Sequence, residues 1–310
     1  MNLDIDVKKR KLIKDFIWLR SKINFDFIFD KDEFSQEDIR RYYKKTKFLL
    51  YRLGGSKEGY MHIGVSDDGL HKKGENYQTY HLNKINDIIK KHNFKNVLEL
   101  GSGQGANMAY LAKTHPNVNF TGIDLYPSLD KKNKKYNISL IEGDYHNLKQ
   151  VESNSMDFVY AIETLCYSTN KNQIFKEVNR VLKKDGIFVI FDAYLAKERS
   201  ELSEIEAIGA ALVENGYYLD EFEFIGNIDN YIKENNFEII LAENLKNKVI
   251  NHLYAYQDKI KKLFKFGSLF SIFCKMIPKE VLGNIVPIYF MANTVDLDLS
   301  VYYYHVLKKK

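Results

Sequence analysis

Residues 97–105, which read VLELGSGQG, place three glycines at alternate positions directly after a short apolar run. The run is typical of a buried strand, and the residues that follow it are typical of a helix. Gly101 allows a sharp turn, Gly103 lets a ligand approach the backbone with no Cβ in the way, and Gly105 allows close packing of the helix. The segment therefore predicts a strand, a ligand-binding loop and a helix in succession.

Strand and helix patterns alternate around this loop. Helices are predicted at 76–92, 107–114 and 172–182, and strands at 96–100, 119–123, 138–142, 156–162 and 186–191. Lys184-Asp185-Gly186 predicts a turn that leads into the fifth strand. Such alternation indicates a parallel sheet covered by helices.

The N-terminal part of the chain has a different pattern. Apolar residues at helical spacing predict a helix around 12–19, and Ser35 as an N-cap predicts a second helix through 51. Residues 54–74 are rich in glycine and aspartate and are predicted to form a long loop. Long ordered loops are often functional.

Beyond Asp192 the pattern is mostly helical, with strands predicted at 237–240 and 299–307. Residues 247–294 are predicted to form helices over the carboxyl edge of the sheet. The part from Phe264 to Met291 is unusually apolar. Three interpretations stay open for it: the wall of an apolar pocket, a core helix pair, or a segment that contacts anionic lipid with the help of nearby lysines.

Acidic residues stand at the ends of the first three predicted strands: Glu99, Asp124 and Asp144. The glycine spacing is not that of the dinucleotide fingerprint, which aims a helix N-terminus at a pyrophosphate. A tighter loop preceded by Glu99 suits a ligand that carries an ammonium group. Asp124 is placed to accept both hydroxyls of a ribose, and Asp144 to accept from an adenine amino group.

Taken in order along the chain, ELGSGQG at 99–105, Asp124, Gly143-Asp144 and LKKDG at 182–186 resemble the class I S-adenosylmethionine-dependent methyltransferases. The resemblance covers roughly residues 77–194. It implies an α/β fold with a Rossmann-like, seven-stranded, mostly parallel sheet, helices on both faces, and helical lid segments at the N- and C-terminal ends. It also implies S-adenosyl-L-methionine as the cofactor.

The resemblance assigns cofactor contacts residue by residue. Gly101, Gly103 and Gln104 line the methionine part, and Asp124 binds the ribose. Asp144 and Tyr145 face the adenine, although packing within the loop is an equal alternative for Tyr145. The full expected set is Glu99, Gly101, Gly103, Gln104, Asp124, Leu125, Gly143, Asp144, Tyr145, Glu163 and Tyr80. The alternative is a fold of this kind that binds no cofactor.

Two further segments resemble the small-molecule methyltransferases that include sterol, tocopherol and natural-product enzymes. The stretch from Tyr42 to Gly64, with Tyr60-Met61-His62-Ile63-Gly64, looks like their N-terminal lid. ETLCY at 163–167 looks like the Glu-Ala-x-Cys-His segment of the sterol enzymes, with Tyr167 where they carry histidine. Tyrosine, with a pKa of ~10, is a poor proton acceptor, which counts against a sterol substrate.

Glu163, His62 and Tyr60 are the candidate catalytic residues. Glu163 either stabilises a cation near the sulfonium, positions the amine of the cofactor, or caps the next turn. His62 either contacts the substrate or is a surface loop residue without a role. Tyr80 and His81 either pack on the carboxylate of the cofactor, as the resemblance implies, or only pack their helix.

The leading hypothesis is methyl transfer to a small, largely apolar acceptor, a lipid or a natural product. Because the sulfonium already activates the methyl group, the enzyme must mainly align the acceptor and exclude water. One alternative is N-methylation of an amine or phospho-amine head group. The other is a non-catalytic, cofactor-binding scaffold protein.

Composition bounds the remaining properties. The chain has 310 residues, and no apolar run approaches the ~18 residues of a membrane span. Peripheral lipid contact stays open, and the lack of an apolar leader favours a cytoplasmic location. Cys166 and Cys274 are expected to be buried thiols, and no metal site is expected. The oligomeric state is left open.

The net charge of +5 is small for a nucleic-acid-binding protein. The lysine-rich runs at 131–135 and 308–310 are typical of solvated surface, so no nucleic-acid partner is expected. Three stretches follow from these patterns: an N-terminal helical segment and lid loop at 1–75, a cofactor-binding core at 76–194, and helical substrate-binding insertions with the last two strands at 195–310.

Overall fold

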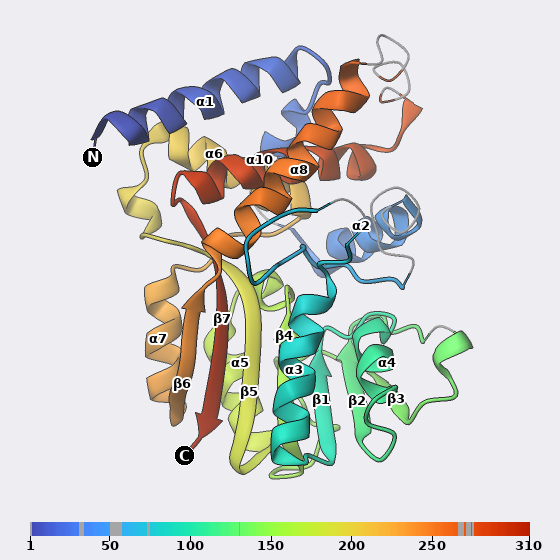
Figure 1. The fold of residues 1–310 in the computed structure, drawn as a ribbon. Coiled ribbons are helices and arrows are strands. Elements are labelled where there is room, and N and C mark those ends of the chain that lie inside the picture. Colours follow the sequence, from blue (N-terminus) through green and yellow to red (C-terminus); the bar gives the residue numbers. More distant parts are fainter. Residues whose placement is uncertain are drawn as a thin grey trace.

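The computed structural model describes residues 2–30, 34–49, 58–72, 75–129, 131–265, 270, 274 and 276–310. These ranges contain a seven-stranded sheet with the order β3-β2-β1-β4-β5-β7-β6 (Figure 1). The strands are β1 (Asn96–Leu100), β2 (Asn119–Asp124), β3 (Ile138–Glu142), β4 (Met156–Ile162), β5 (Leu182–Leu195), β6 (Phe237–Asn244) and β7 (Ser300–Lys309).

The first five strands pair in parallel, and β7 lies antiparallel between β5 and β6. The predicted seven-stranded, mostly parallel sheet is therefore confirmed. Because parallel strands share a direction, the carboxyl ends of β1 to β5 meet at one edge, the upper edge in Figure 1. The acids that end or follow these strands are brought to this edge.

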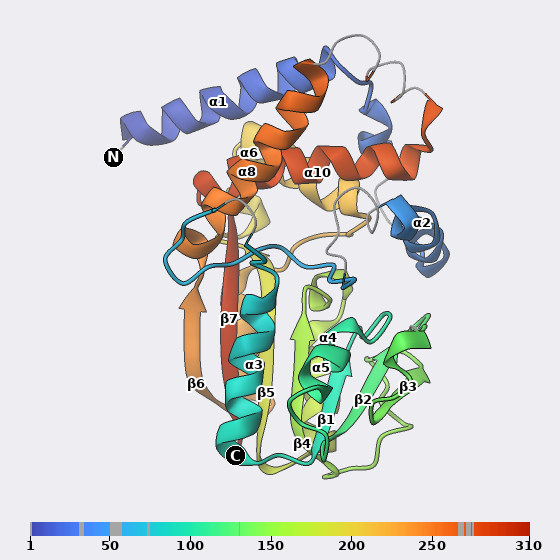
Figure 2. The same ribbon diagram turned by 45° about the vertical axis from the view of Figure 1, so that its right-hand side comes forward.

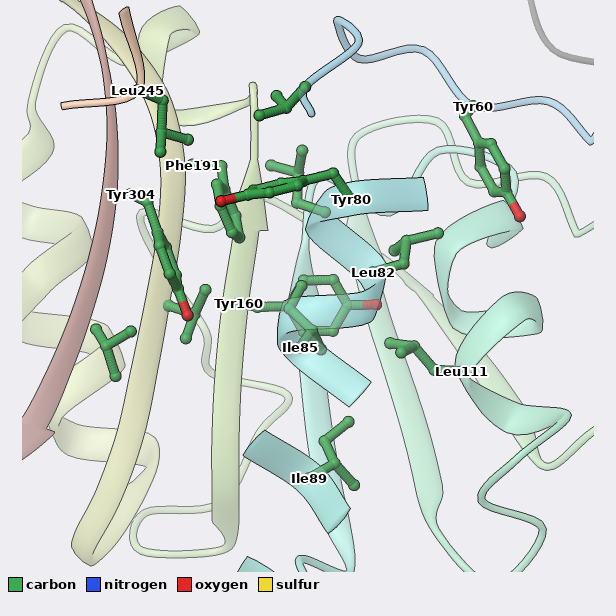
Figure 3. Close-up of a cluster of buried hydrophobic side chains, with 14 of the residues drawn as sticks. Tyr60, Tyr80, Leu82, Ile85, Ile89, Leu111, Tyr160, Phe191, Leu245 and Tyr304 are labelled. Carbon is green, nitrogen blue, oxygen red and sulfur yellow. The ribbon is translucent and has the colours of Figure 1, made fainter. Parts of the chain in front are cut away.

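Helices cover both faces of the sheet. They are α3 (Thr79–His92), α4 (Ala106–Ala112), α5 (Lys171–Val181) and α7 (Ile225–Glu234). Alternate residues of β4 explain the two layers, since Phe158 and Tyr160 are buried with α3 and α4, whereas Val159 and Ala161 are buried with α5 and α7. Figure 3 shows the first of these clusters, with Tyr160 facing α3.

A layer of helices lies over the carboxyl edge of the sheet (Figures 1 and 2). Its members come from both ends of the chain: α1 (Asn2–Arg20), α2 (Gln36–Leu49), α6 (Glu204–Glu214), α8 (Lys246–Lys265) and α10 (Lys279–Asp296). Phe264, Tyr289 and Phe290 are buried in the apolar cluster of this layer. The core-helix interpretation therefore holds for these three residues, while residues 266–269, 271–273 and 275 lie outside the described part.

Short 3-10 helices connect these elements: η1 (Asp26–Phe29), η3 (Lys131–Asn133), η4 (Leu165–Tyr167), η5 (Arg199–Glu201) and η6 (Asn215–Tyr217). One predicted boundary is wrong. The turn expected at Lys184-Asp185-Gly186 lies inside β5, which begins at Leu182. Asp185 adopts a left-handed φ of 63°, and the register against β4 shifts there, so the turn signal marks an irregularity within a strand.

Residues 58–72, called the lid segment below, cross the carboxyl edge without helix or strand. The other glycine-rich positions of the predicted loop, 54–57 and 73–74, lie outside the described residues. Both cysteines are buried, as predicted. None of the helices in the described ranges has the length and apolarity that crossing a bilayer requires.

Candidate functional site

The glycine loop after β1 is held against β2. The backbone amides of Gly101 and Ser102 both donate to the Ile123 carbonyl, at 2.9 and 3.1 Å. Gly101 and Gly103 have φ values of 69° and 50°, in the left-handed region that favours glycine. A Cβ on Gly101 would lie 2.0 Å from Thr164 Oγ1, whereas one on Gly103 would meet nothing within 4 Å. The fold itself requires Gly101, and Gly103 leaves open space for a ligand.

Asp124, at the end of β2, is oriented by two backbone amides. Its Oδ2 accepts from the Gly103 amide at 2.9 Å, and its Oδ1 accepts from the Tyr126 amide at 2.8 Å. The carboxylate thus links the glycine loop to the turn after β2, which contains half-buried Leu125. Each carboxylate oxygen keeps a further lone pair, which suits the two hydroxyls of a ribose.

Asp144 and Tyr145 lie after β3. Asp144 Oδ1 accepts from the backbone amide of His146 and pairs with His146 Nδ1, at 2.9 and 2.6 Å. The Tyr145 hydroxyl donates to the Thr164 carbonyl at 3.1 Å, which joins this loop to the one after β4. Gly143 donates from its amide to the Asp124 carbonyl at 2.9 Å, so the three predicted residues border one loop cluster.

Glu99 is buried at the end of β1. Its Oε1 accepts from Asn107 Nδ2 at 2.8 Å. Its Oε2 makes no hydrogen bond of good geometry to the described residues, and the buried Tyr160 hydroxyl also lies beside this carboxyl. Burial raises the pKa of this carboxyl to about 8. An orphaned buried carboxyl oxygen is costly unless something binds it, so the side chain is suited to a cationic ligand or an ordered water.

Glu163 follows β4 with a φ of 48°, which is a strained backbone conformation for a residue with a side chain. Its amide donates to the Phe191 carbonyl at 2.8 Å. Its Oε1 accepts from the Ile63 amide of the lid segment at 2.9 Å and from the Tyr302 hydroxyl at 2.8 Å. Burial raises the pKa of Glu163 to about 8.

His62 and Tyr60 are buried in the lid segment, so the interpretation of His62 as a surface residue is wrong. His62 Nε2 lies 3.3 Å from Asn107 Oδ1, and its ring is stacked with Tyr60 at 5.7 Å and edge-on to His81 at 4.5 Å. Burial lowers the pKa of His62 to about 4, which keeps the imidazole neutral. The lid segment thereby contacts Glu99, through Asn107, and Glu163, through Ile63.

Two predicted residues have different surroundings. The Tyr80 hydroxyl accepts from Lys248 Nζ at 3.3 Å, and the ring lies in the α3 cluster beside Phe191 (Figure 3). No contact in the described structure joins Tyr80 to the glycine loop, so its position fits the packing alternative. Gln104 is half-buried in the loop without a hydrogen bond to the described residues.

Sequence reasoning missed Tyr302 and Asn107 and left His81 undecided. Tyr302 is on the face of β7 opposite the one formed by Val301 and Tyr303. Its hydroxyl lies 2.8 Å from His81 Nε2 as well as from Glu163. The available signal was the run of three tyrosines at 302–304, since a tyrosine in a buried strand needs a partner for its hydroxyl.

Comparison with known proteins agrees with this geometry. Residues 98–190 match the family model described as a methyltransferase domain. The sarcosine/dimethylglycine N-methyltransferase of Aphanothece halophytica is 25% identical over 69% of this chain and 79% of that enzyme. The chain is a class I S-adenosylmethionine-dependent methyltransferase.

Other relatives of this methyltransferase differ in their named substrates. The sterol 24-C-methyltransferase of Saccharomyces cerevisiae is 27% identical over 48% of this chain, which spans only 40% of the yeast enzyme. A mycolic acid cyclopropane synthase, solved in complex with SAH and CTAB, has a TM-score of 0.68 at 12% identity and covers 89% of this chain and 99% of its own. The likeness to the synthase shows the fold alone, and the curated relatives differ in their named substrates, which include sarcosine, sterols and tRNA.

The residues of the methyltransferase fit its cofactor, S-adenosylmethionine, in two respects. The backbone at Gly103 has open space before it, and the buried Oε2 of Glu99 makes no hydrogen bond of good geometry to the described residues. The cofactor supplies a methyl group on a positively charged sulfur. The residues of the chain must hold it, align an acceptor and keep water out.

Proposed function

We propose that the protein transfers the methyl group of S-adenosylmethionine to a small molecule with a largely apolar body, held between Glu163 and the helical layer. The observation that carries this proposal is the character of the side chains gathered there. Cys166 and Tyr167 of η4 pack in the same apolar cluster as Tyr217 and Met291, which come from distant parts of the chain.

Hydrogen bonds connect these side chains in a continuous wall. The Tyr167 hydroxyl donates to the Tyr217 carbonyl at 3.2 Å, and the Tyr217 hydroxyl donates to Met291 Sδ at 3.7 Å. Burial raises the pKa of the Tyr217 hydroxyl well above its ordinary value, so this phenol is neutral. A neutral aromatic and thioether surface favours an apolar acceptor body.

The cofactor side follows from the geometry of the loops. In the proposal, Gly101, Gly103 and Gln104 receive the methionine part, and Glu99 balances its ammonium group. Asp124, with Leu125 beside it, binds the ribose hydroxyls. Gly143, Asp144 and Tyr145 border the adenine, with Asp144 Oδ2 as the acceptor of the amino group, because it has no partner among the described residues.

Methyl transfer also requires that water be excluded from the sulfonium. The lid segment is suited to this task because its Ile63 amide bonds Glu163 and its buried His62 lies against α4. Tyr60 stacks on His62 and supports it. In this proposal Glu163 faces the reacting groups, whereas His62 and Tyr60 close the site.

An amine acceptor is the second candidate, and Glu163 is the observation that favours it. In the described structure the polar partners of this carboxyl are an amide and a phenol, and no lysine or arginine pairs with it. An unpaired acid beside aromatic rings suits a cation. The Aphanothece halophytica relative is named as an N-methyltransferase of sarcosine and dimethylglycine, which are amines.

Incubation with S-adenosylmethionine labelled in the methyl group tests both candidates. The protein is mixed separately with a lipid-soluble cell extract and with a panel of polar amines. Label in a lipid-soluble molecule is the expected result, and label only among the polar amines would favour the second candidate. Label recovered only in RNA or protein would overturn both. Asp229→Asn, an exposed change on α7, serves as the control variant.

A further inference from the structure

A chain of three side chains from three elements leads away from Glu163 into the core. Glu163 Oε1, after β4, lies 2.8 Å from the Tyr302 hydroxyl on β7. The same hydroxyl lies 2.8 Å from His81 Nε2 on α3. Tyr302 is 3% exposed and His81 is fully buried, so both contacts are shielded from solvent.

The hydrogen-bond inventory fixes how this chain is arranged when Glu163 is ionised. Tyr302 has a single hydroxyl proton, which it then donates to the carboxylate. His81 must donate its Nε2 proton to the Tyr302 oxygen, which leaves Nδ1 as the bare ring nitrogen. His81 Nδ1 is buried and makes no hydrogen bond of good geometry in the described structure, although the Gln78 backbone beside the ring raises the pKa of His81 against the larger effect of burial. The pair therefore supplies one oriented donor to Oε1.

Packing alone does not account for these residues. Phenylalanine at position 302 and leucine at position 81 would fill the same core without burying polar atoms. The backbone of Glu163 is held in the left-handed region at a φ of 48°. Buried polar side chains beside a strained backbone are typical of a functional site rather than of a structural core.

The two oxygens of Glu163 have different surroundings. Oε1 accepts from the Ile63 amide and the Tyr302 hydroxyl, which fixes the carboxyl plane. Oε2 accepts no hydrogen bond from the described residues. One oxygen is thus used for positioning, and the other is free for the acceptor.

We propose that Tyr302 and His81 are positioning residues that hold Glu163 as the base for an acceptor that loses a proton when it is methylated. Such acceptors are neutral primary or secondary amines and alkenes, as opposed to tertiary amines, carboxylates and phenolates. The proposal deepens the proposed function and rests on it. It adds a specific class of acceptor and two residues that do not touch it.

The step balances in atoms and charge. The nitrogen lone pair or the alkene π electrons form the bond to the methyl carbon, and the carbon–sulfur bond breaks with its electron pair going to sulfur. The product then carries the positive charge that the sulfonium had. Its N–H or C–H proton passes to Glu163 Oε2, which leaves a neutral product, neutral sulfur and a neutral carboxyl.

The other titratable groups that face Glu163 are Asp192 on β5, Cys166 on η4, Tyr217 on η6, Tyr256 on α8 and Tyr302 on β7. Burial raises the pKa values of the thiol and the phenols, so these groups are neutral near pH 7. Burial raises the pKa of Asp192 to about 6, so it is ionised at pH 7.5. Burial also keeps His81 neutral by lowering its pKa. Glu163 is therefore the group of this set that responds to a cation at pH 7.5.

Sinefungin and S-adenosylhomocysteine are the probes for the test. Sinefungin carries a protonated amine where the cofactor carries its methyl group, and S-adenosylhomocysteine has no charge there. The ratio of their dissociation constants isolates the charge that faces Glu163, because Glu99 acts equally on both ligands. Calorimetry at pH 7.5 measures the two constants for each variant.

The wild type is expected to prefer sinefungin, and Glu163→Gln to lose that preference. Tyr302→Phe should reduce the preference about fivefold while binding S-adenosylhomocysteine normally, because the oriented donor to Oε1 is lost. His81→Gln should reduce it less. Tyr304→Phe is the matched control, since Tyr304 is buried on the same face of β7 against Phe191 and touches none of the three residues.

Different outcomes would contradict the two proposals. If neither ligand binds the wild type, the proposed function fails. If both bind equally well, or if Tyr302→Phe leaves the preference unchanged, the positioning role fails alone. A measurement on the wild type keeps the test valid if a variant misfolds. Sinefungin binding should release a proton, so the binding enthalpy should depend on the ionisation enthalpy of the buffer. A binding enthalpy that is the same in all buffers would contradict the positioning role.

The acceptor class is tested with S-adenosylmethionine carrying a ¹³C methyl group. Carbon NMR of the product formed from a cell extract distinguishes methyl groups on nitrogen or carbon from those on oxygen. A methyl group on nitrogen or carbon is expected. A methyl ester or a phenol ether would overturn the acceptor class while leaving the proposed methyl transfer intact.

Discussion

On the side of β1 and β2, the site is lined mainly by backbone, whereas on the side of β4 and β7 it is lined by side chains. The first side consists of the glycine loop and Asp124, whose carboxylate is bonded by two amides within the same region. The second side joins Ile63, Glu163 and Tyr302, which are far apart in the chain. The proposed cofactor half is formed by residues close in sequence, whereas the proposed acceptor half is formed by residues far apart in the chain.

The difference indicates which part of this fold determines the choice of acceptor. A loop built from backbone amides and glycines recognises a cofactor by shape and serves many reactions without change. Side chains from the lid segment, β4 and β7 meet only when the whole chain folds. A substitution in the first half is expected to act on cofactor binding, and one in the second half on the acceptor.

Substitutions at the two glycines of the loop test most directly whether the backbone there binds a ligand. Gly101→Ala should lower the melting temperature by at least about 5 °C, because its Cβ would lie 2.0 Å from Thr164 Oγ1. Gly103→Ala should keep the fold at the smaller cost of a strained left-handed φ, since nothing lies within 4 Å of the added Cβ, yet weaken S-adenosylhomocysteine binding about 100-fold. Thermal melts and calorimetry measure the two effects. Equal loss of stability in both variants would refute a ligand space at Gly103.

Asp124→Asn is expected to weaken S-adenosylhomocysteine binding about 30-fold, which corresponds to about 2 kcal/mol. The amide removes the charge and presents a donor to either the Gly103 amide or the Tyr126 amide, which are donors themselves. Calorimetry measures the dissociation constant. Asp229→Asn, exposed on α7, is the control and should bind as the wild type does. Normal affinity in Asp124→Asn would remove this residue from the cofactor half.

The cofactor half could be predicted from sequence because its signals are short and local. The glycines of residues 101–105 and the acid Asp124 stand beside the strands that orient them, so their positions follow once the parallel sheet is recognised. The seven-stranded, mostly parallel sheet was predicted through the family resemblance and is confirmed, whereas its strand order and the antiparallel β7 come from the structure alone. The turn at Lys184-Asp185-Gly186 was wrong because a strand can absorb a left-handed residue as an irregularity.

The acceptor half could not be predicted in the same way. Glu163 stood out in the sequence, but its partner Tyr302 is on β7, and no local pattern indicates which of three consecutive tyrosines faces it. His62 was left between a surface role and a functional one because burial of a loop residue depends on what packs over it. Such contacts follow from strand register and lid placement, which are properties of the folded chain.

The ionisation of Glu99 should make the stability of the folded protein depend on pH. Burial raises its pKa from the ordinary 4.5 to about 8 in the folded protein, so the fold favours the protonated acid. The stability this provides is present below pH 4.5 and is lost as the pH rises through about 8. Glu99→Gln should therefore melt about 3 °C above the wild type at pH 8.5, with a smaller difference at pH 6.

The same variant should gain less from the cofactor. A cation near Glu99 offsets the cost of ionising it, so S-adenosylmethionine should raise the melting temperature of the wild type more than that of Glu99→Gln at pH 8.5. Melting curves with and without the cofactor measure both differences. A wild type whose stability does not fall relative to Glu99→Gln between pH 6 and pH 8.5 would contradict the assignment of a neutral Glu99.

The lid segment is where the two halves meet, and Gln78 anchors it. Gln78 Nε2 donates to the His62 carbonyl at 2.7 Å and to the Tyr60 carbonyl at 3.3 Å. Gln78→Ala should release the lid segment by removing these two part-buried hydrogen bonds, and weaken S-adenosylhomocysteine binding only about threefold. Amide exchange in residues 58–72 should quicken, while exchange in β1 and β4 stays unchanged.

Because His62 contacts Glu99 through Asn107 and Ile63 contacts Glu163 directly, loosening the lid segment should affect both halves equally. An effect confined to one half would mean that the lid segment belongs to that half alone.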